Sequence, residues 1–360
     1  MSAPSTILVT GGAGFIGSHA CVELLDHGYE LIVVDDYSNS SPQVFARVDR
    51  IAGRFLGTVY ELDIRDRRAL SAVFDRHSVD AVVHFAAHKA VGTSTRMPIE
   101  YYDVNVGGTT ALLNTMHEHG VHQLVFSSSC SVYGDAGHGR LDESTPARPT
   151  NPYAASKLAC EQILADVCRR RPEYTVLCLR YFNPAGAHPS GLLGEDPRGS
   201  PDNLLPNVAQ VAVGRRERLR VFGDDYPTPD GTAIRDYLHV MDTVEAHRVA
   251  LDHLADERGM RVYNLGIGTG SSVLDVIAAF SRECGRPIPY EMVPRRPGDV
   301  AELVADATAV ARAWGWHPSR DLSDMCRDAW RFQQLNPHGY AGSARRPNGA
   351  GSARRPNTKG

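Results

Sequence analysis

Two residues that can move a proton lie four positions apart near the middle of the chain. The stretch NPYAASKLAC contains Tyr153 and Lys157. Asn151 suits an N-cap and Pro152 suits the first helical position, so the sequence predicts that Tyr153 lies in the first turn of a helix. Side chains four apart share a helix face, and an ammonium beside a phenol stabilises the phenolate, as does the positive end of the helix. The pair therefore predicts a tyrosine that acts as a general base.

A run of hydroxyls upstream can assist that tyrosine. The stretch LVFSSSCSVYG predicts a strand that ends near Phe126, followed by a serine-rich loop at the carboxyl edge of the sheet. From this edge, Ser129 can hydrogen-bond the oxygen that loses its proton. Ser129, Tyr153 and Lys157 fit one reaction, in which a tyrosinate takes the proton of an alcohol while the adjacent carbon gives hydride to a nicotinamide.

A glycine-rich turn near the start of the chain predicts where that nicotinamide cofactor binds. In TGGAGFIG, Gly12, Gly14 and Gly17 have the G-x-G-x-x-G spacing, directly after the apolar run ILV. Helical apolar spacing follows from Phe15 to Leu25, which is the strand–turn–helix context that this motif needs. Glycines allow a tight turn and a close approach of the backbone to a pyrophosphate, which the first helical N–H groups face.

The next predicted strand indicates which dinucleotide binds. The strand in ELIVVDD ends at Asp35, eighteen positions after Gly17, close to the spacing of about 20 at which a carboxylate reaches the ribose hydroxyls. An acid there repels a 2′-phosphate. Because no Arg or Lys follows until Arg47, the sequence predicts NAD rather than NADP.

Short apolar strands alternate with helical patterns over the first half of the chain. We expect strands at 6–10, 31–35, 58–62, 81–86, 123–127 and 175–180. This alternation predicts an α/β fold, a doubly wound parallel Rossmann sheet with ligands at the carboxyl ends of its strands, together with a smaller α/β substrate-binding lobe.

Beyond about residue 182 the sequence predicts fewer helices and strands, and loops such as NPAGAHPSG and GDDYPTPDGT separate them. We expect an NAD-binding domain at 1–182 and a smaller second lobe at 183–340, with segments near 236–270 returning to the first domain. The segment 341–360 contains GSARRPN twice and is too polar to form a core, so we expect a disordered tail.

Composition excludes several other classes of protein. A net charge of −4 gives no global reason for binding nucleic acid or a membrane, and no apolar run approaches the length of a membrane span. The seven cysteines form no two-residue-spaced pair and the fifteen histidines no ladder, so we expect no metal site and a reducing, cytoplasmic location.

Beyond these local patterns, the chain resembles the extended short-chain dehydrogenase/reductase family, and within it the nucleotide-sugar 4-epimerases. The resemblance runs from about Thr6 to Tyr340 and is carried by VTGGAGFIGSH, HFAAHKAVG, FSSSCSVYGD, NPYAASK, LRYFNPAGAHPSG, GDDYPTPDGTAIRDYLHVMD, YNLGIG and PRRPGD. It implies a homodimer that interconverts UDP-galactose and UDP-glucose through a 4-keto sugar, with NAD held as a prosthetic group. It suggests that the dimer forms through helices near 101–118 and 153–170.

The resemblance also assigns roles to individual positions. The catalytic residues it implies are Ser129, Tyr153 and Lys157. The cofactor contacts it implies are Gly11, Gly14, Phe15, Ile16, Gly17, Asp35, Asp36, Asn39, Ser40, Asp63, Ile64, Phe85, Ala86, Ala87, Lys89, Tyr153, Lys157 and Phe182. The UDP-sugar contacts it implies are Ser129, Tyr153, Asn183, Asn203, Leu204, Arg235, Arg296, Asp299 and Leu303. Arg235 and Arg296 suit this assignment chemically, because a guanidinium group can bind a diphosphate through two parallel hydrogen bonds.

The chain departs from the family pattern at several positions. The family usually has Asn where Val104 stands, and Gly and Leu are common where Ala87 and His88 stand; Ala154 and Ala155 replace a Gly and a Lys. Leu303 occupies a position where some members have a bulky Tyr that narrows the sugar pocket. A smaller residue there predicts tolerance of N-acetylated UDP-hexoses.

Of three alternatives, the sequence leaves the first open and argues against the other two. Pentose or uronate 4-epimerases share the same motifs. A 4,6-dehydratase typically has an Asp–Glu pair where this chain has Cys130 and Ser131. An NAD-sensing regulatory protein on the same fold tends to lose the Tyr/Lys pair, which this chain keeps.

Overall fold

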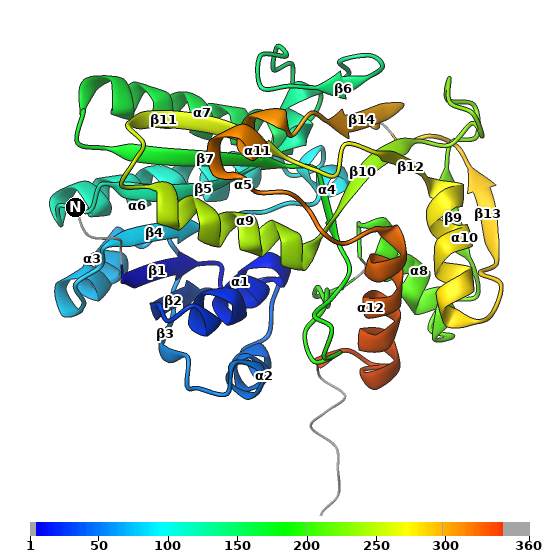
Figure 1. Cartoon of the computed structure of the whole chain (residues 1–360), viewed down its shortest axis with the longest axis horizontal. Helices are drawn as coiled ribbons and strands as arrows, with labels where there is room; N and C mark the ends of the chain where they lie inside the picture. The colour runs from blue at the N-terminus through cyan, green and yellow to red at the C-terminus, as the bar shows by residue number, and fades with distance from the viewer. Residues whose placement is uncertain (1–4, 200, 297, 341–360) are drawn as a thin grey trace, which may run out of the picture.

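Parallel strands form the central sheet of the computed structural model, which describes residues 5–199, 201–296 and 298–340. The sheet has seven strands in the order β11-β7-β5-β4-β1-β2-β3 (Figure 1). They are β1 (Thr6–Thr10), β2 (Glu30–Asp35), β3 (Gly57–Glu61), β4 (Ala81–His84), β5 (Gln123–Ser129), β7 (Thr175–Tyr181) and β11 (Gly259–Leu265). The order runs outward in both directions from β1 and β4, so the predicted doubly wound Rossmann sheet is confirmed.

Alternate residues of each strand point to opposite faces, and a separate apolar core covers each face. On one face, Ile7 and Val9 pack with α1 (Phe15–Asp26), α2 (Gln43–Ala52), α9 (Val240–His253) and α11 (Thr308–Trp314). On the other face, Leu8 packs with α3 (Arg67–Arg76), α6 (Gly108–Glu118) and α7 (Pro152–Arg170). Because both faces are buried, the strands read as continuous apolar runs, which is why the sequence revealed them.

A second lobe lies beside the carboxyl ends of these strands, on the right in Figure 1. One sheet has the order β12-β10-β14-β6, with β8 paired to β10, and a two-stranded sheet joins β9 to β13. Helices α8, α10 and α12 share the lobe's apolar core. The bounds are β6 (Arg140–Leu141), β8 (Asn183–Ala185), α8 (Leu204–Ala212), β9 (Leu219–Phe222), β10 (Ile234–His239), β12 (Gly270–Ser272), α10 (Val273–Cys284), β13 (Tyr290–Val293), β14 (Glu302–Ala305) and α12 (Leu322–Leu335).

Two expectations from the sequence were wrong in detail. The serine run is strand rather than loop, since Ser127, Ser128 and Ser129 extend β5 and pair with the end of β7. The region after residue 182 is also richer in regular elements than expected, because its short strands are hidden among loop residues. The predicted tail, 341–360, lies outside the described residues.

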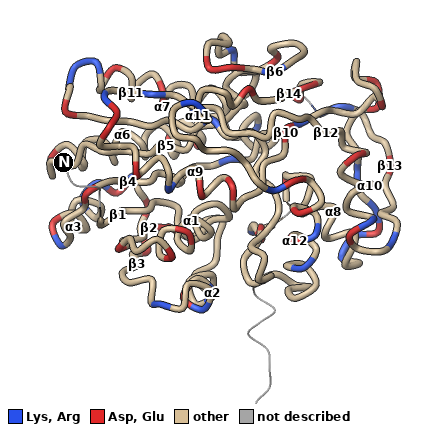
Figure 2. The backbone as a smooth tube through the Cα atoms, in the orientation of Figure 1, with Lys and Arg blue, Asp and Glu red and all other residues tan. Residues whose placement is uncertain are grey.

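The chain crosses between the lobes more than once. After β8 and β10 in the second lobe, α9 packs beside α1 on the first sheet, and β11 pairs with β7 at its edge. Charges of both signs are interspersed over both lobes in Figure 2. Among the described helices, none combines the length and apolarity that a membrane crossing needs.

Candidate functional site

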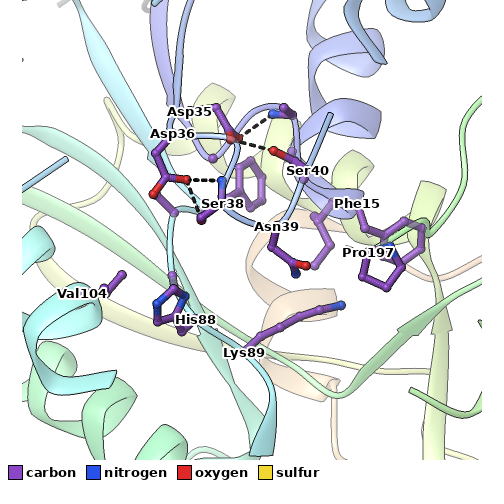
Figure 3. A pocket seen from close by; sticks show the side chains of 18 of the residues that line it. Phe15, Asp35, Asp36, Ser38, Asn39, Ser40, His88, Lys89, Val104 and Pro197 are labelled. Carbon is purple, nitrogen blue, oxygen red and sulfur yellow. Dashed lines mark hydrogen bonds between the residues drawn. The ribbon is translucent and has the colours of Figure 1, made fainter. Parts of the chain in front are cut away.

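A cavity of about 170 Å³ opens at the carboxyl ends of β1, β2 and β4 (Figure 3). It is lined by the glycine turn, by the segments that follow these strands and β3, by residues of the segment 194–197, and by Tyr153 and Lys157 of α7. Of the predicted cofactor contacts, it brings together Gly11, Gly14, Phe15, Ile16, Gly17, Asp35, Asp36, Asn39, Ser40, Asp63, Ile64, Phe85, Ala86, Ala87, Lys89, Tyr153 and Lys157.

The glycine turn leaves room for a ligand. Gly11 has φ +69° and a Cβ there would lie 2.7 Å from the Ala86 nitrogen, while a Cβ on Gly17 would lie 2.2 Å from the Gly11 oxygen. The protein's own packing therefore requires these two glycines. A Cβ on Gly14 would meet only the Gly11 oxygen, at 3.3 Å, so the space in front of the amino end of α1 is open. This cradle fits the pyrophosphate of a dinucleotide.

Asp35 connects the ends of β1 and β2. Its carboxylate accepts hydrogen bonds from the Ala13 amide at 2.8 Å, the Tyr37 amide at 2.9 Å and the Ser40 hydroxyl at 2.8 Å. Burial raises the pKa of Asp35, and these three donors oppose that shift. Besides lining the cavity, Asp35 thus fixes the glycine turn, a role that the spacing did not reveal. Tyr37 has φ +54°, the one positive φ among the described non-glycine residues, which marks this loop as strained.

Tyr153 and Lys157, the residues predicted to move the proton, lie on helix α7. Its N-cap prediction is confirmed: the Asn151 side chain accepts from the Ala154 amide at 2.9 Å, and Pro152 begins the helix. Tyr153 and Lys157 are 7% and 4% exposed. The Lys157 ammonium donates to the carbonyl oxygen of Ser127, at 2.7 Å, which ties α7 to the end of β5.

The electrostatics of Tyr153 differ from the expectation. Burial raises the pKa of Tyr153 to about 12, and its hydrogen bond with Ser129 opposes this rise. Burial also lowers the pKa of Lys157. The sequence suggested a depressed phenol pKa because the spacing of the pair shows the nearby charge but not the depth of burial. In this structure the ammonium is directed at a backbone carbonyl instead.

A buried ionic network holds α7 against the sheet. Glu161 of α7 pairs with Arg180 of β7 at 2.5 Å and accepts from the Ser128 hydroxyl of β5. Arg180 also donates to the Tyr133 hydroxyl, at 3.1 Å. Breaking a buried ion pair leaves an uncompensated charge, which is costly. The network therefore holds α7, and Tyr153 with it, in a fixed position relative to the ends of β5 and β7.

The remaining predicted site residues lie outside this cavity. Ser129 is buried at the end of β5, and Phe182 packs in one cluster with Cys130 and Leu303. In the second lobe, Leu303 pairs with Arg235, and Asn183 pairs with Tyr237 two positions along β10. Asn183 has a buried side-chain oxygen with no protein partner among the described residues.

The last predicted contacts lie on loops and at a helix start. The Arg296 guanidinium donates to the Asp299 carboxylate at 3.1 Å. Asn203 is the N-cap residue of α8, which begins at Leu204, and its amide donates to Glu195 at 2.8 Å. The structure does not bring these residues into the cavity described above.

Several residues that line the cavity were missed by the sequence analysis: Ala13, Val34, Ser38, Ser41, Leu62, Tyr181, Gly194, Glu195, Asp196, Pro197 and Tyr340. The segment 194–197 and Tyr340 come from remote parts of the chain, and no local motif marks them. Three departures from the family pattern, Ala87, His88 and Val104, also line the cavity. Val104 lies in a π-helical segment, Tyr102–Gly107.

Comparisons with known proteins agree with this geometry. Residues 7–266 match the model of the NAD dependent epimerase/dehydratase family. The UDP-glucose 4-epimerase of Bacillus subtilis is 51% identical over 334 residues, which cover 93% of this chain and 98% of that protein.

Solved structures of UDP-sugar 4-epimerases are also similar to this chain. The UDP-glucose 4-epimerase of Bifidobacterium longum, solved with NAD+ and UDP, superposes with a TM-score of 0.91 at 50% identity and covers 93% of this chain and 100% of that one. The UDP-Glc/GlcNAc 4-epimerase of Campylobacter jejuni has a TM-score of 0.79 at 37% identity, covering 92% and 99%.

Proposed function

The chain belongs to the NAD-dependent epimerase/dehydratase family, and from this premise we propose that it is an NAD-dependent UDP-glucose 4-epimerase, which interconverts UDP-galactose and UDP-glucose. The observation that carries the proposal is that Tyr153 and Lys157 line the same cavity as the dinucleotide-type glycine turn. Purified protein is expected to convert UDP-galactose to UDP-glucose without added cofactor, as followed by NMR of the anomeric proton. No conversion, or formation of a 4-keto-6-deoxy product, would contradict it.

We propose the following roles for the chain's own residues. NAD, held by the residues that line the cavity, would supply the acceptor for hydride from C4 of the sugar and the donor for its return. The Tyr153 oxygen removes the proton of the sugar 4-hydroxyl, while the Ser129 hydroxyl hydrogen-bonds that oxygen. The positive charge of Lys157 favours the phenolate. When C4 is reduced again on its other face, Tyr153 returns the proton to the oxygen, so the residues end as they began.

Epimerisation requires that the 4-keto sugar turn while the nucleotide stays fixed. We propose that Arg235 and Arg296 hold the diphosphate, with Asn183, Asn203, Leu204 and Asp299 around it. Arg235 supports this assignment because it lies on β10 in register with Leu303 of β14, which shares an apolar cluster with Cys130 and Phe182. Residues 1–182, with α9 and β11, form the proposed NAD-binding domain, and the rest of 183–340 forms the sugar-nucleotide lobe.

We propose that Leu303 admits N-acetylated UDP-hexoses. Leu303 shares a buried apolar cluster with Phe182 and with Cys130, the residue after Ser129, so a larger tyrosine ring there would fill space near the proposed sugar site. Leu303→Tyr is expected to abolish turnover of UDP-N-acetylgalactosamine while keeping that of UDP-galactose, measured as kcat/KM for both substrates. Leu303→Met, which conserves volume, is the control and keeps both activities. Wild-type protein that turns over UDP-galactose but not UDP-N-acetylgalactosamine would refute this assignment.

A homodimer is also proposed, formed along 101–118 and 153–170. Apolar side chains are unusually exposed at the start of this region: Ile99 at 80%, Met97 at 44% and Tyr102 at 42%. The short helix α5 (Pro98–Tyr101) and the π-helical segment pack on α7, so these residues adjoin both proposed segments. Such exposed apolar groups are typical of protein interfaces.

Sedimentation at micromolar concentration is expected to show a dimer for the wild type and a monomer for Ile99→Glu. Phe55→Glu, at a residue that is 77% exposed elsewhere on the surface, is expected to remain dimeric. A wild-type protein that sediments only as a monomer would exclude the proposed dimer.

We further propose a cytoplasmic location. Each of the seven cysteines lies in the described part of the chain and is a free thiol, and six of them are buried. This pattern suits a reducing compartment.

The described residues contain no cluster of three or more His, Cys, Asp or Glu that could hold a metal ion.

A further inference from the structure

We propose that Tyr340 is a positioning residue for the bound dinucleotide: it holds the segment Gly194–Arg198 against the cofactor cavity and so slows the release of NAD. The inference rests on the proposed function, because it takes NAD as the ligand of the cavity. It concerns residues more than 140 positions apart, none of which belongs to the glycine turn or to the proton-moving group.

The segment Gly194–Arg198 forms one wall of the cavity. Gly194, Glu195, Asp196 and Pro197 all line it, and Figure 3 labels Pro197 among the lining side chains. This wall follows β8 in the chain, and Figure 3 shows Pro197 beside Phe15, the first residue after the glycine turn. Its position is therefore set by tertiary contacts alone.

One side of the wall is attached to residues that we assign to the cofactor. The Glu195 carboxylate pairs with the Lys89 ammonium at 2.5 Å. The Arg198 amide donates to the Asn39 side chain, and its guanidinium donates to the Ser40 carbonyl, both at 3.1 Å. The wall thus reaches the loops that follow β2 and β4 directly.

The other side of the wall is held by Tyr340. Its hydroxyl accepts from the Gly194 amide at 3.1 Å and donates to the Gly194 carbonyl at 2.9 Å. Its backbone amide donates to the Asp196 carboxylate at 2.7 Å. Tyr340 is 4% exposed, so these bonds are sheltered from water, and losing a partner there leaves buried polar groups unsatisfied.

The Tyr340 ring is itself fixed by α12 and α2. Its centre lies 5.6 Å from that of Phe332, and the Arg47 guanidinium lies 4.6 Å above it. A Cβ on Gly194 would come within 2.3 Å of the Phe332 ring, and one on Gly339 within 2.2 Å of the Asp196 carboxylate. Such close packing leaves the wall little room to move while Tyr340 is in place.

The test is the exchange of bound NAD. Tyr340→Phe keeps the ring and removes both bonds of its hydroxyl to Gly194. Holoenzyme is diluted into excess isotope-labelled NAD, and the release of unlabelled NAD is followed by mass spectrometry. We expect exchange about tenfold faster than in the wild type, and less NAD retained after purification. Arg198→Ala loosens the other side of the wall and is expected to act in the same direction, should Tyr340→Phe fold poorly.

Tyr263→Phe is the matched control. Tyr263 is also buried and loses one hydroxyl bond, to Glu257 at 3.0 Å, far from the cavity, so it is expected to exchange NAD at the wild-type rate. Wild-type exchange in both Tyr340→Phe and Arg198→Ala, or equal acceleration in Tyr263→Phe, would overturn the inference and leave the proposed function intact. A wild-type protein that binds no NAD would overturn both.

Discussion

Replacing Tyr153 by phenylalanine is expected to slow the interconversion of UDP-galactose and UDP-glucose by about 10²- to 10⁴-fold. The substitution removes only the oxygen that takes the proton of the 4-hydroxyl, and the buried ring keeps its packing, since Tyr153 is 7% exposed. The decrease should appear in kcat measured from initial rates at saturating substrate, with little change in the thermal stability of the protein.

The matched control for this variant is Tyr29→Phe. The Tyr29 hydroxyl donates to Asp252 at 2.6 Å, remote from the cavity, so its removal is expected to leave kcat unchanged. A Tyr153→Phe protein that keeps wild-type kcat would remove Tyr153 from the mechanism.

The second large effect is expected for Lys157→Met. Without a positive charge four residues away on the same helix face, the phenolate of Tyr153 is less stable relative to the phenol. The pKa of Tyr153 therefore rises further from its buried value of about 12. Activity requires the phenolate, so the rising limb of the pH–rate profile should move to higher pH by about one unit or more, and the rate at neutral pH should fall by about tenfold or more.

A structural role for Lys157 alone would give a different result. Its ammonium also donates to the Ser127 carbonyl, so Lys157→Met is expected to lower stability by about 1–3 kcal/mol. Lost stability reduces the amount of active protein but does not displace the pH limb. Measuring kcat per folded enzyme molecule from pH 6 to pH 10 beside thermal melts separates the two effects. A higher pKa of Tyr153 lowers this kcat by the same factor at every pH in that range, and an unchanged kcat per folded molecule would assign Lys157 to folding only.

The sheet was predictable because its strands are buried on both faces and leave unbroken apolar runs, such as those of β1 and β2. The extension of β5 through its serines was not predictable locally. Ser127 meets His247 and Ser128 meets Glu161, which lie 120 and 33 residues away. These distant partners satisfy hydroxyls that would otherwise favour a loop.

The residues that line the cavity also include some that the sequence marks and some that it does not. The contacts that follow β1, β2 and β4 directly are marked by motifs, because a strand end fixes what comes next in space. The wall at Gly194–Arg198 and its attachment to Tyr340 depend on contacts between residues more than 100 positions apart, for which no local signal exists. The depth of Tyr153 is likewise a property of the packed structure, which is why its pKa was expected to shift in the opposite direction.

The central claim is that epimerisation proceeds by removing and restoring the hydrogen on C4, with Tyr153 handling only the hydroxyl proton. Protein supplied with UDP-galactose deuterated at C4, in ordinary water and without added cofactor, tests it directly. We predict that the UDP-glucose formed keeps its deuterium at C4, as seen by mass spectrometry and NMR. UDP-glucose carrying hydrogen from solvent at C4 would contradict the account.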